Sequence, residues 1–252
     1  MDIVLLTALG VGGATVIGAL IGFSFKRISH KFSDIILSFA AGVMLCAAVF
    51  GLIQPSLEYG SKASVFVTII GVFCGALILN FLDKAIPHLH RLSGIETESH
   101  TQRNEKLDKV LLFVMAIAIH NLPEGIAAGV GFGTENTAEA LTIAAGIALQ
   151  NIPEGMVIIA PMLSAGMSKK RTLFAASMTG VVEVVGTFLG YFAVTLSSAI
   201  LPFALAFAGG TMLYVISDEM IPETHHNGSE RYATYALLVG FSVMLLMDYF
   251  LG

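Results

Sequence analysis

Two short segments place metal-binding groups inside apolar surroundings. Residues 120–125 read His-Asn-Leu-Pro-Glu-Gly, and residues 150–155 read Gln-Asn-Ile-Pro-Glu-Gly. The segments share Asn, Pro, Glu and Gly at the same offsets, and apolar residues flank both of them. Residues four apart lie on one face of a helix, so the first and fifth residues of each segment point the same way. Imidazole, amide and carboxylate groups together suit zinc or a similar divalent cation.

The composition indicates that these segments lie in a membrane. Of the 252 residues, 56% are hydrophobic and only 12% are charged. The mean hydropathy is +0.83, and soluble domains carry roughly 25% charged residues. A helix needs about 20 apolar residues to cross a bilayer. The sequence therefore predicts an all-α integral membrane protein, a single transmembrane domain with eight spans at about 2–25, 33–55, 63–86, 108–131, 138–164, 172–198, 203–221 and 232–251.

The positions of Lys and Arg predict how the spans are oriented. They follow the first, third, fifth and seventh spans, and the other loops hold only Lys62. Basic loops are cytoplasmic by the positive-inside rule, so both termini are expected to be extracytoplasmic. The first apolar segment has no basic region before it, which predicts a retained span and not a signal peptide. The net charge of −5 gives no indication of a nucleic-acid partner.

Three carboxylates near the middle of predicted spans have no compensating positive charge. Glu124 and Glu154 belong to the two motifs, and Glu183 lies in the sixth span, whereas no Lys or Arg lies at comparable depth in any span. Each ionised group at the bilayer centre costs roughly 2.5–3.5 kcal/mol on insertion scales. Either the carboxylates are protonated or a positive ion visits them. With the imidazole of His120 beside them, the second alternative predicts a cation site.

The prolines of the two motifs predict a cavity at the same depth. Pro123 and Pro153 each remove a helical hydrogen bond, which frees the carbonyl groups of Ile119 and Leu149. Freed backbone groups at membrane depth are tolerated where they line a cavity or are buried in protein.

The asparagines suggest a second, neighbouring metal position. Asn121 and Asn151 are rotated by about 100° from the first face of their helices. They could line an adjacent pocket while Glu124 and Glu154 border both pockets. With Glu183 added, we hypothesise two neighbouring metal positions bridged by the two glutamates.

Other polar groups lie nearer the predicted cytoplasmic side. The loop from about 87 to 107 contains His88 and His90, which either bind metal weakly or are simply solvated. A second cluster sits where the seventh span meets the cytoplasm, and we hypothesise that it handles metal; it contains Asp218, Glu219, Glu223, His225 and His226. Met44 and Met212 are expected to fill the core, although thioethers are soft enough to contact a soft metal.

These motifs resemble the ZIP family of divalent metal transporters, and specifically its bacterial, zinc-preferring branch. Residues 120–125 resemble the signature of the family's fourth helix, and residues 150–155 resemble its counterpart on the fifth. Glu183 lies where the sixth helix supplies a bridging carboxylate. Residues 217–225, the eight spans and the His-bearing loop also resemble the family, so the resemblance covers essentially the whole chain.

The resemblance implies a bundle of three, two and three helices, with spans 1–3 and 6–8 as inverted repeats around the central pair. It implies transport of zinc, or of cadmium, iron or manganese, into the cytoplasm through a bacterial inner membrane. The metal is then the substrate, no cofactor or enzymatic activity is expected, and the partners are metal ions and lipid, with a homodimer left open.

The resemblance also implies roles for individual residues. The first metal position would consist of His120, Glu124, Gln150 and Glu154, and the second of Asn121, Glu124, Asn151, Glu154 and Glu183. Met44, Met212 and Asp248 would lie along the outer pathway, and the cluster from Asp218 to His226 would handle release. Two residues depart from the family, because many members have His at the place of Gln150 and some have Asp at the place of Asn151.

Two other functions fit parts of the sequence. An intramembrane metalloprotease would keep His and Glu within a span, but its usual HExxH motif is absent. The repeated Asn-x-Pro would suit a channel for neutral solutes, but three carboxylates at the bilayer centre would bind cations and obstruct it. The sequence leaves open whether a metal transporter of this kind is a carrier or a channel.

Overall fold

The protein is described by a computed structural model that covers residues 1–252 except 26–27, 60–63, 93–101, 135 and 227, with side chains described outside 86–113 and Ala116. All regular structure in this part of the chain is helical, as predicted. The elements are α1 (Asp2–Gly22), α2 (His30–Cys46), η1 (Ala47–Ile53), α3 (Gln54–Glu58), α4 (Ser64–Leu92), α5 (Gln102–Gly131), α6 (Thr137–Ser164), α7 (Lys169–Leu196), η2 (Ser198–Ile200), α8 (Leu201–Val215), η3 (Ile216–Met220), α9 (Ile221–Thr224) and α10 (Glu230–Leu251).

Seven helical segments in the described residues are long and apolar enough to cross a membrane. They correspond to the predicted spans other than 108–131, which falls within α5. Helix also covers both ends of the segment predicted as a loop at 87–107, because α4 continues to Leu92 and α5 begins at Gln102. Glu, Lys, Arg and Gln in this segment favour helix, so nothing in the sequence requires the helices to stop at the bilayer surface.

Side-chain caps fix where several helices begin. Ser29 accepts a hydrogen bond from the amide of Phe32 at the start of α2, and Ser168 accepts one from Arg171 at the start of α7. Asn136 accepts from the amides of Ala138 and Glu139 at the start of α6. Each cap satisfies amide groups that have no partner within their own helix.

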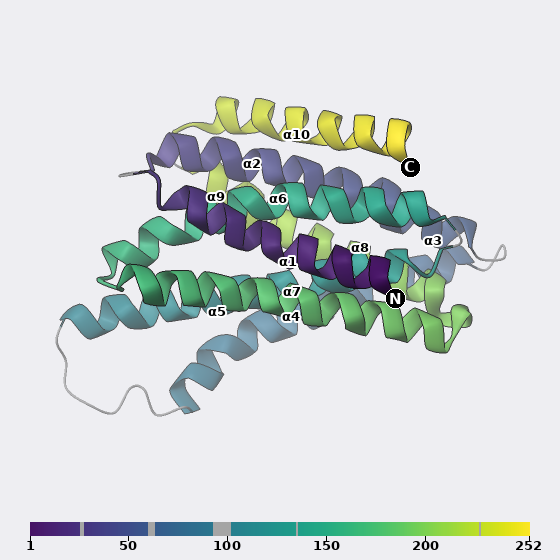
Figure 1. Cartoon of the computed structure of the whole chain (residues 1–252), viewed down its shortest axis with the longest axis horizontal. Helices are drawn as coiled ribbons and strands as arrows, with labels where there is room; N and C mark the ends of the chain where they lie inside the picture. Colours follow the sequence, from purple (N-terminus) through teal and green to yellow (C-terminus); the bar gives the residue numbers. More distant parts are fainter. Residues whose placement is uncertain (26–27, 60–63, 93–101, 135, 227) are drawn as a thin grey trace.

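The long helices form one bundle (Figure 1), and their contacts define two sets of helices. In one set, α6 and α7 pack on α1, and α5 packs on α7; in the other, α2 packs against α10 and α4 against α8. The two sets meet mainly where α2 contacts α6 and α5 contacts α8. Both termini lie at one end of the bundle, and α2, α7 and α10 begin at the opposite end (Figure 1).

Glycines bring the helices of the first set together at backbone distance. A Cβ atom on Gly18 would overlap the main chain of α6 at Ile152, and one on Gly186 would overlap α5 at Leu122. Gly12 of α1 and Gly180 of α7 meet each other's carbonyl oxygen in the same way. Small residues at such interfaces are typical of membrane helices, where close approach supplies much of the association energy.

Two helices are interrupted by a π-helical segment followed by a proline. The segment η1 continues α2 and precedes Pro55, and η3 continues α8 and precedes Pro222. A π-helical turn adds one residue and turns the following side chains to a new direction, and such turns are frequent at functional sites. The turn at η3 carries Asp218 and Glu219.

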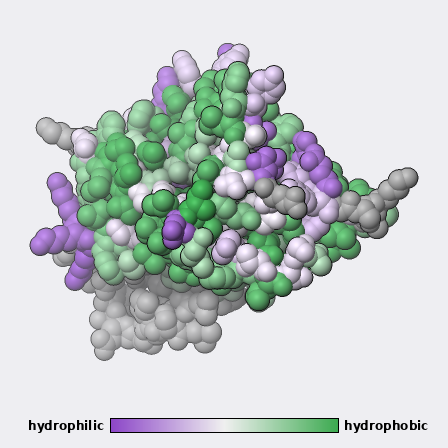
Figure 2. All heavy atoms as spheres, turned by 45° about the vertical axis from the view of Figure 1, so that its right-hand side comes forward, coloured by the Kyte–Doolittle hydropathy of each residue, from purple (hydrophilic) through white to green (hydrophobic). Residues whose placement is uncertain are grey.

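Hydrophobic side chains cover most of the molecular face seen in Figure 2. On α4, Phe66, Phe73, Leu77 and Phe81 are at least 65% exposed. On α10, Tyr235, Tyr249 and Phe250 are at least 71% exposed. Apolar surface on this scale would be unfavourable in water, so these faces are expected to contact lipid.

Candidate metal site

The two motifs face each other across the boundary between α5 and α6. Nε2 of Gln150 donates a 2.8 Å hydrogen bond to Oε1 of Glu124, which joins the fifth residue of one motif to the first residue of the other. Gln150 and Glu124 are at most 1% exposed. Four of the seven residues predicted to form the two metal positions line one cavity: His120, Asn121, Glu124 and Glu154.

Glu183 of α7 lies behind the motifs and is fully buried. Its Oε1 accepts hydrogen bonds from Asn121 Nδ2 and, at 2.7 Å, from Thr15 Oγ1. Its Oε2 accepts from Asn151 Nδ2 at 2.6 Å. Donors from α5, α1 and α6 therefore meet on this one carboxylate, and charge-assisted hydrogen bonds of this kind stabilise a buried anion.

Four buried side-chain oxygen atoms of the motifs have no hydrogen-bond partner among the described residues. They are Oδ1 of Asn121, Oε2 of Glu124, Oε1 of Gln150 and Oδ1 of Asn151. The NH₂ group of each of the three amides donates a hydrogen bond to a carboxylate, and the amide oxygen has no partner among the described residues. Unpaired buried oxygen atoms are costly unless another group approaches them, and cations could approach such atoms without needing a proton donor.

The cavity has a volume of about 600 Å³ and extends from the motifs to the far end of α8 and α9. Leu37, Ile117, Val157, Ile158 and Val215 give it apolar walls. Its other end is lined by Asp218, Glu219, Glu223 and His226, four of the five residues predicted to handle metal release. One continuous space thus joins the motifs to the second polar cluster.

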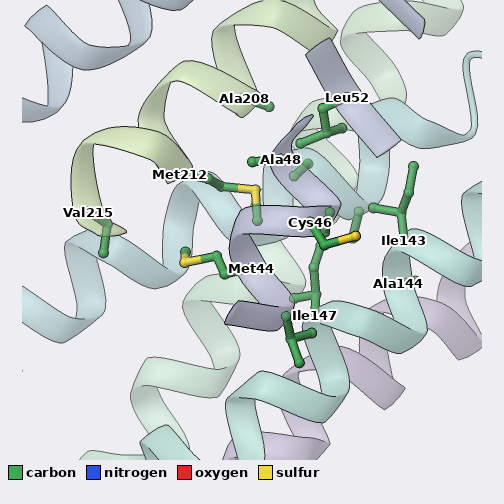
Figure 3. Packing of buried hydrophobic residues seen from close by; sticks show 14 of the residues in the cluster. Met44, Cys46, Ala48, Leu52, Ile143, Ala144, Ile147, Ala208, Met212 and Val215 are labelled. Carbon is green, nitrogen blue, oxygen red and sulfur yellow. The ribbon is translucent and has the colours of Figure 1, made fainter. Parts of the chain in front are cut away.

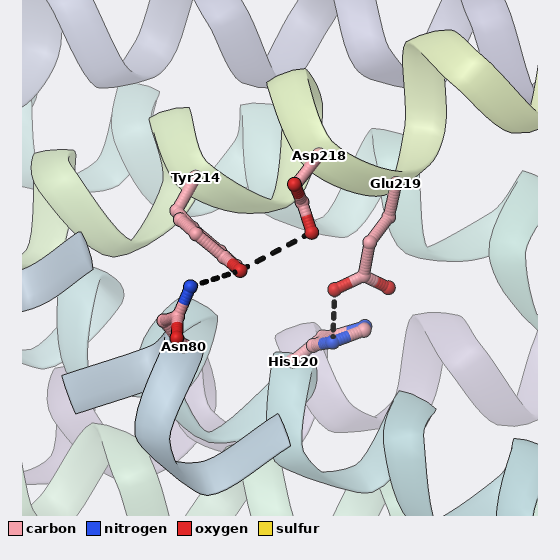
Figure 4. A network of polar contacts seen from close by, with 5 residues as sticks. All are labelled: Asn80, His120, Tyr214, Asp218 and Glu219. Atoms are coloured by element: carbon pink, nitrogen blue, oxygen red, sulfur yellow. Dashed lines mark hydrogen bonds and ion pairs between the residues drawn. The ribbon is translucent and has the colours of Figure 1, made fainter. Parts of the chain in front are cut away.

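A third group of possible ligands lies between these two ends. Nε2 of His120 is 2.8 Å from Oε1 of Glu219, the distance of an ion pair. Neither atom makes a hydrogen bond of acceptable geometry among the described residues. One ligand atom from each of Asp83, His120 and Glu219 lies within 4.8 Å of the others. Figure 4 shows His120 pointing toward η3, so its ring faces Glu219.

A hydrogen-bonded chain holds the neighbouring carboxylate in place. Asn80 donates to the hydroxyl of Tyr214 at 2.9 Å, and that hydroxyl donates to Asp218 Oδ2 at 3.1 Å (Figure 4). The chain connects α4 to the π-helical turn of η3. Asp218 is therefore fixed at the rim of the cavity, whereas Glu219 is free to pair with His120.

Three further predicted residues, Met44, Met212 and Asp248, do not line the cavity. Met44 and Met212 are fully buried in the hydrophobic core, where Figure 3 shows them near Ala48 and Ile147. Asp248 is partly exposed on α10. His88 and His90 lie on the last turns of α4, where side chains are outside the described part of the structure.

His225 is engaged in contacts that hold α9 against α10. Its Nδ1 lies 3.0 Å from Thr224 Oγ1 and 2.9 Å from the carbonyl oxygen of Ile221. Its Nε2 lies 3.1 Å from Thr234 Oγ1. With both ring nitrogens occupied, His225 fits a structural contact better than a ligand for a departing metal.

Four residues that the sequence did not single out contact this region: Thr15, Asn80, Asp83 and Tyr214. Asp83 is next to Lys84 near the end of the predicted third span, within α4. Thr15 and Tyr214 lie in apolar segments without a motif around them. A signal existed only for Asp83, as an acidic residue within an otherwise apolar span.

The fold is that of a helical membrane protein, and the residues described above form a buried polar cluster suited to a cation. A family model described as "ZIP Zinc transporter" matches residues 90–248. A zinc transporter GufA from Myxococcus xanthus is 41% identical over 98% of both chains. Zinc transporter ZIPB from Bordetella bronchiseptica is 36% identical over 95% of this chain and 78% of its own length. Zinc transporter ZupT from Chlorobaculum parvum is 34% identical over 92% of this chain and 91% of its own.

The chain belongs to the ZIP zinc transporter family. The resemblance seen in residues 120–125 and 150–155 is confirmed by these matches, which extend over almost the whole chain.

Proposed function

We propose that this protein moves zinc, or a similar divalent cation, across a membrane into the cytoplasm through the site between α5 and α6. The family consists of transporters, and the metal is the substrate and not a cofactor. Cadmium, iron and manganese are further candidate substrates, because carboxylate and amide oxygens accept each of them.

One observation carries this proposal: four buried oxygen atoms of the two motifs are unpaired, in a region that also holds His120 and Glu154. Amides alone would suit a neutral solute, but carboxylates with unpaired oxygens favour a cation. Cations would bind at two neighbouring positions. The ligands of the first are His120, Glu124, Gln150 and Glu154, and those of the second are Asn121, Glu124, Asn151, Glu154 and Glu183.

The direction of opening supports transport toward the polar cluster. The cavity runs from the motifs to Asp218, Glu219, Glu223 and His226. Beyond the cavity, Met44 follows the lining residue Leu37 along α2 and Met212 precedes the lining residue Val215 along α8, and both methionines are fully buried among apolar residues. We propose that this arrangement is the cytoplasm-facing state and that Asp83, His120 and Glu219 pass the cation from the motifs to the exit.

We propose eight membrane spans, with α5 as the one that adds to the seven apolar segments. Two features support an inverted 3+2+3 arrangement: the matched packing of α1 on α6 and of α7 on α5, and the π-helical turns at η1 and η3. Basic residues begin α2, α7 and α10, at the end opposite both termini, which supports extracytoplasmic termini (Figure 1). A bacterial inner membrane is the proposed location, and a homodimer is compatible with the exposed apolar faces.

The purified protein in liposomes tests this function directly. We expect saturable influx of radioactive zinc that competing cadmium reduces, and no flux of glycerol. Glycerol flux independent of zinc would instead indicate the neutral-solute channel, and absence of zinc flux from protein that is folded and inserted would contradict the proposal.

Replacing His120 with Gln should reduce zinc uptake on the order of tenfold and manganese uptake by a smaller factor, because imidazole is the softer ligand. Uptake of both metals is measured in cells that lack their own uptake systems. His225→Gln is the control, since His225 lies outside the cavity. Equal losses for zinc and manganese would contradict a role of His120 as a metal ligand.

Replacing Asp83 with Asn should lower the maximal rate of zinc uptake, on the order of threefold to tenfold, because the local negative potential along the exit is reduced. The zinc concentration at half-maximal rate should change little, since the motifs are intact. Initial rates in liposomes measure both quantities. Lys84→Gln, one residue away, should transport zinc as the wild type does, and a wild-type rate for Asp83→Asn would remove Asp83 from the route.

A further inference from the structure

Thr15 is a buried hydroxyl that belongs to neither motif but contacts the site. It lies in the middle of α1 and is 1% exposed. Its Oγ1 donates a 2.7 Å hydrogen bond to Oε1 of Glu183, across 168 positions of the sequence. Buried Ser and Thr hydroxyls in helices commonly donate to a carbonyl oxygen of the preceding turn. Thr187 of α7 does so, with Oγ1 2.9 Å from the carbonyl oxygen of Glu183. The side-chain contact of Thr15 to another helix is therefore specific.

The glycine that ends each motif allows the main chain of a neighbouring helix to approach closely. A Cβ atom on Gly125 would overlap the carbonyl oxygen of Glu183, and one on Gly155 would overlap the carbonyl oxygen of Thr15. The main chain of Glu183 thus rests on the first motif, and the main chain of Thr15 rests on the second. Only glycine allows this approach, which places both side chains directly behind the ligand residues.

Thr15 and Glu183 occupy matching places in α1 and α7. Each lies three residues after a glycine, Gly12 or Gly180, where α1 and α7 meet each other. Each also lies three residues before a glycine that contacts the third residue of a motif, as described for Gly18 and Gly186. Thr15 is therefore the structural counterpart of Glu183, with a hydroxyl at the place where α7 has a carboxylate.

The consequence of this pairing is the orientation of two amides. Glu183 receives the NH₂ groups of Asn121 and Asn151, one on each oxygen, and both amide oxygens remain unpaired. Nδ2 of Asn151 also lies 3.3 Å from the carbonyl oxygen of Val11, on the same side of α1 as Thr15. If Glu183 moved, either amide could rotate and present NH₂, which repels a cation, in place of its oxygen.

We propose that Thr15 is a positioning residue for the second metal position. Its hydroxyl anchors the Glu183 carboxylate from α1, and the anchored carboxylate holds Asn121 and Asn151 with their oxygens available to the cation. This inference rests on the proposed transport function and adds to it a residue that does not itself touch the metal. The cation's own ligands remain those of the two motifs and Glu183.

The test compares three variants in liposomes, with initial rates of zinc influx measured over a range of zinc concentrations. Thr15→Val removes the hydroxyl at nearly constant volume, and Thr15→Ser retains it. Thr187→Val removes a buried hydroxyl whose hydrogen bond goes to the main chain of Glu183 and not to its carboxylate. We expect Thr15→Val to raise the KM for zinc roughly tenfold, as loss of an outer partner of a metal ligand typically does, with little change in the maximal rate.

Thr15→Ser and Thr187→Val should both keep the wild-type KM. The inference is overturned if Thr15→Val has the wild-type KM, if Thr187→Val raises KM equally, or if Thr15→Ser does not restore it. If Thr15→Val does not fold, the KM of Thr15→Ala is compared with that of Thr15→Ser and Thr187→Val instead. Zinc influx by the wild type distinguishes failure of the proposed function from failure of this inference. Absence of wild-type influx contradicts the proposed function. Wild-type influx together with an unchanged KM for Thr15→Val contradicts this inference alone.

Discussion

Replacing Glu154 with Gln is expected to reduce zinc uptake roughly 100-fold or more, because even the loss of an outer partner of a metal ligand typically costs 10–100-fold in metal affinity. Glu154 lines the cavity together with Glu124 and is expected to border both metal positions. Gln has nearly the same size and can fill the same space, so the change removes charge and leaves packing intact. Glu124→Gln should have an effect of the same order.

The measurement is uptake of radioactive zinc at a matched amount of protein in the membrane. Glu139→Gln is the control on the same helix, since Glu139 lies in the first turn of α6 and contacts Asn136 at 2.9 Å instead of the cavity. Wild-type uptake by both Glu154→Gln and Glu124→Gln would refute the site.

Replacing Gly12 with Ala should destabilise the protein by about 1–3 kcal/mol, the usual cost of overpacking a close contact. The added Cβ would overlap the main chain of α7 at Gly180, and backbone cannot move aside as a flexible side chain can. Gly13→Ala is a matched control in the next position, where a Cβ would have no neighbour within 4 Å among the described residues.

For Gly13→Ala we expect no loss, or a gain of up to about 1 kcal/mol, because Ala favours helix over Gly. Thermal unfolding of both purified variants in the same detergent gives the comparison. Equal midpoints for the two variants would show that α1 and α7 do not depend on this close contact.

The residues of the candidate site could be singled out from the sequence because their signal is local. A carboxylate inside an apolar segment stands out wherever the helix packs, and two copies of Asn-x-Pro-Glu-Gly at a fixed spacing point to opposed sites. The pairing of Gln150 with Glu124 confirms that the two motifs meet. Their orientation toward a cavity depends on the fold and could only be hypothesised.

Other parts of the site depend on contacts between distant segments. The hydroxyl of Thr15 looks like that of any Thr in an apolar helix until α7 is placed beside α1. Asp83 joins His120 and Glu219 only because α4, α5 and η3 converge. The π-helical turns were not predictable either, since one additional residue in a turn leaves an apolar pattern almost unchanged.

The buried methionines bear on how well the protein prevents water and small ions from leaking across the membrane. Met44 lies beyond the cavity residue Leu37 along α2, Met212 precedes the cavity residue Val215 along α8, and both methionines are fully buried among apolar residues. Water and small ions cross such a dry layer poorly. With the proposed function, a cation would occupy the motifs while this layer stays closed, and the membrane potential and ion gradients would be preserved between transport events.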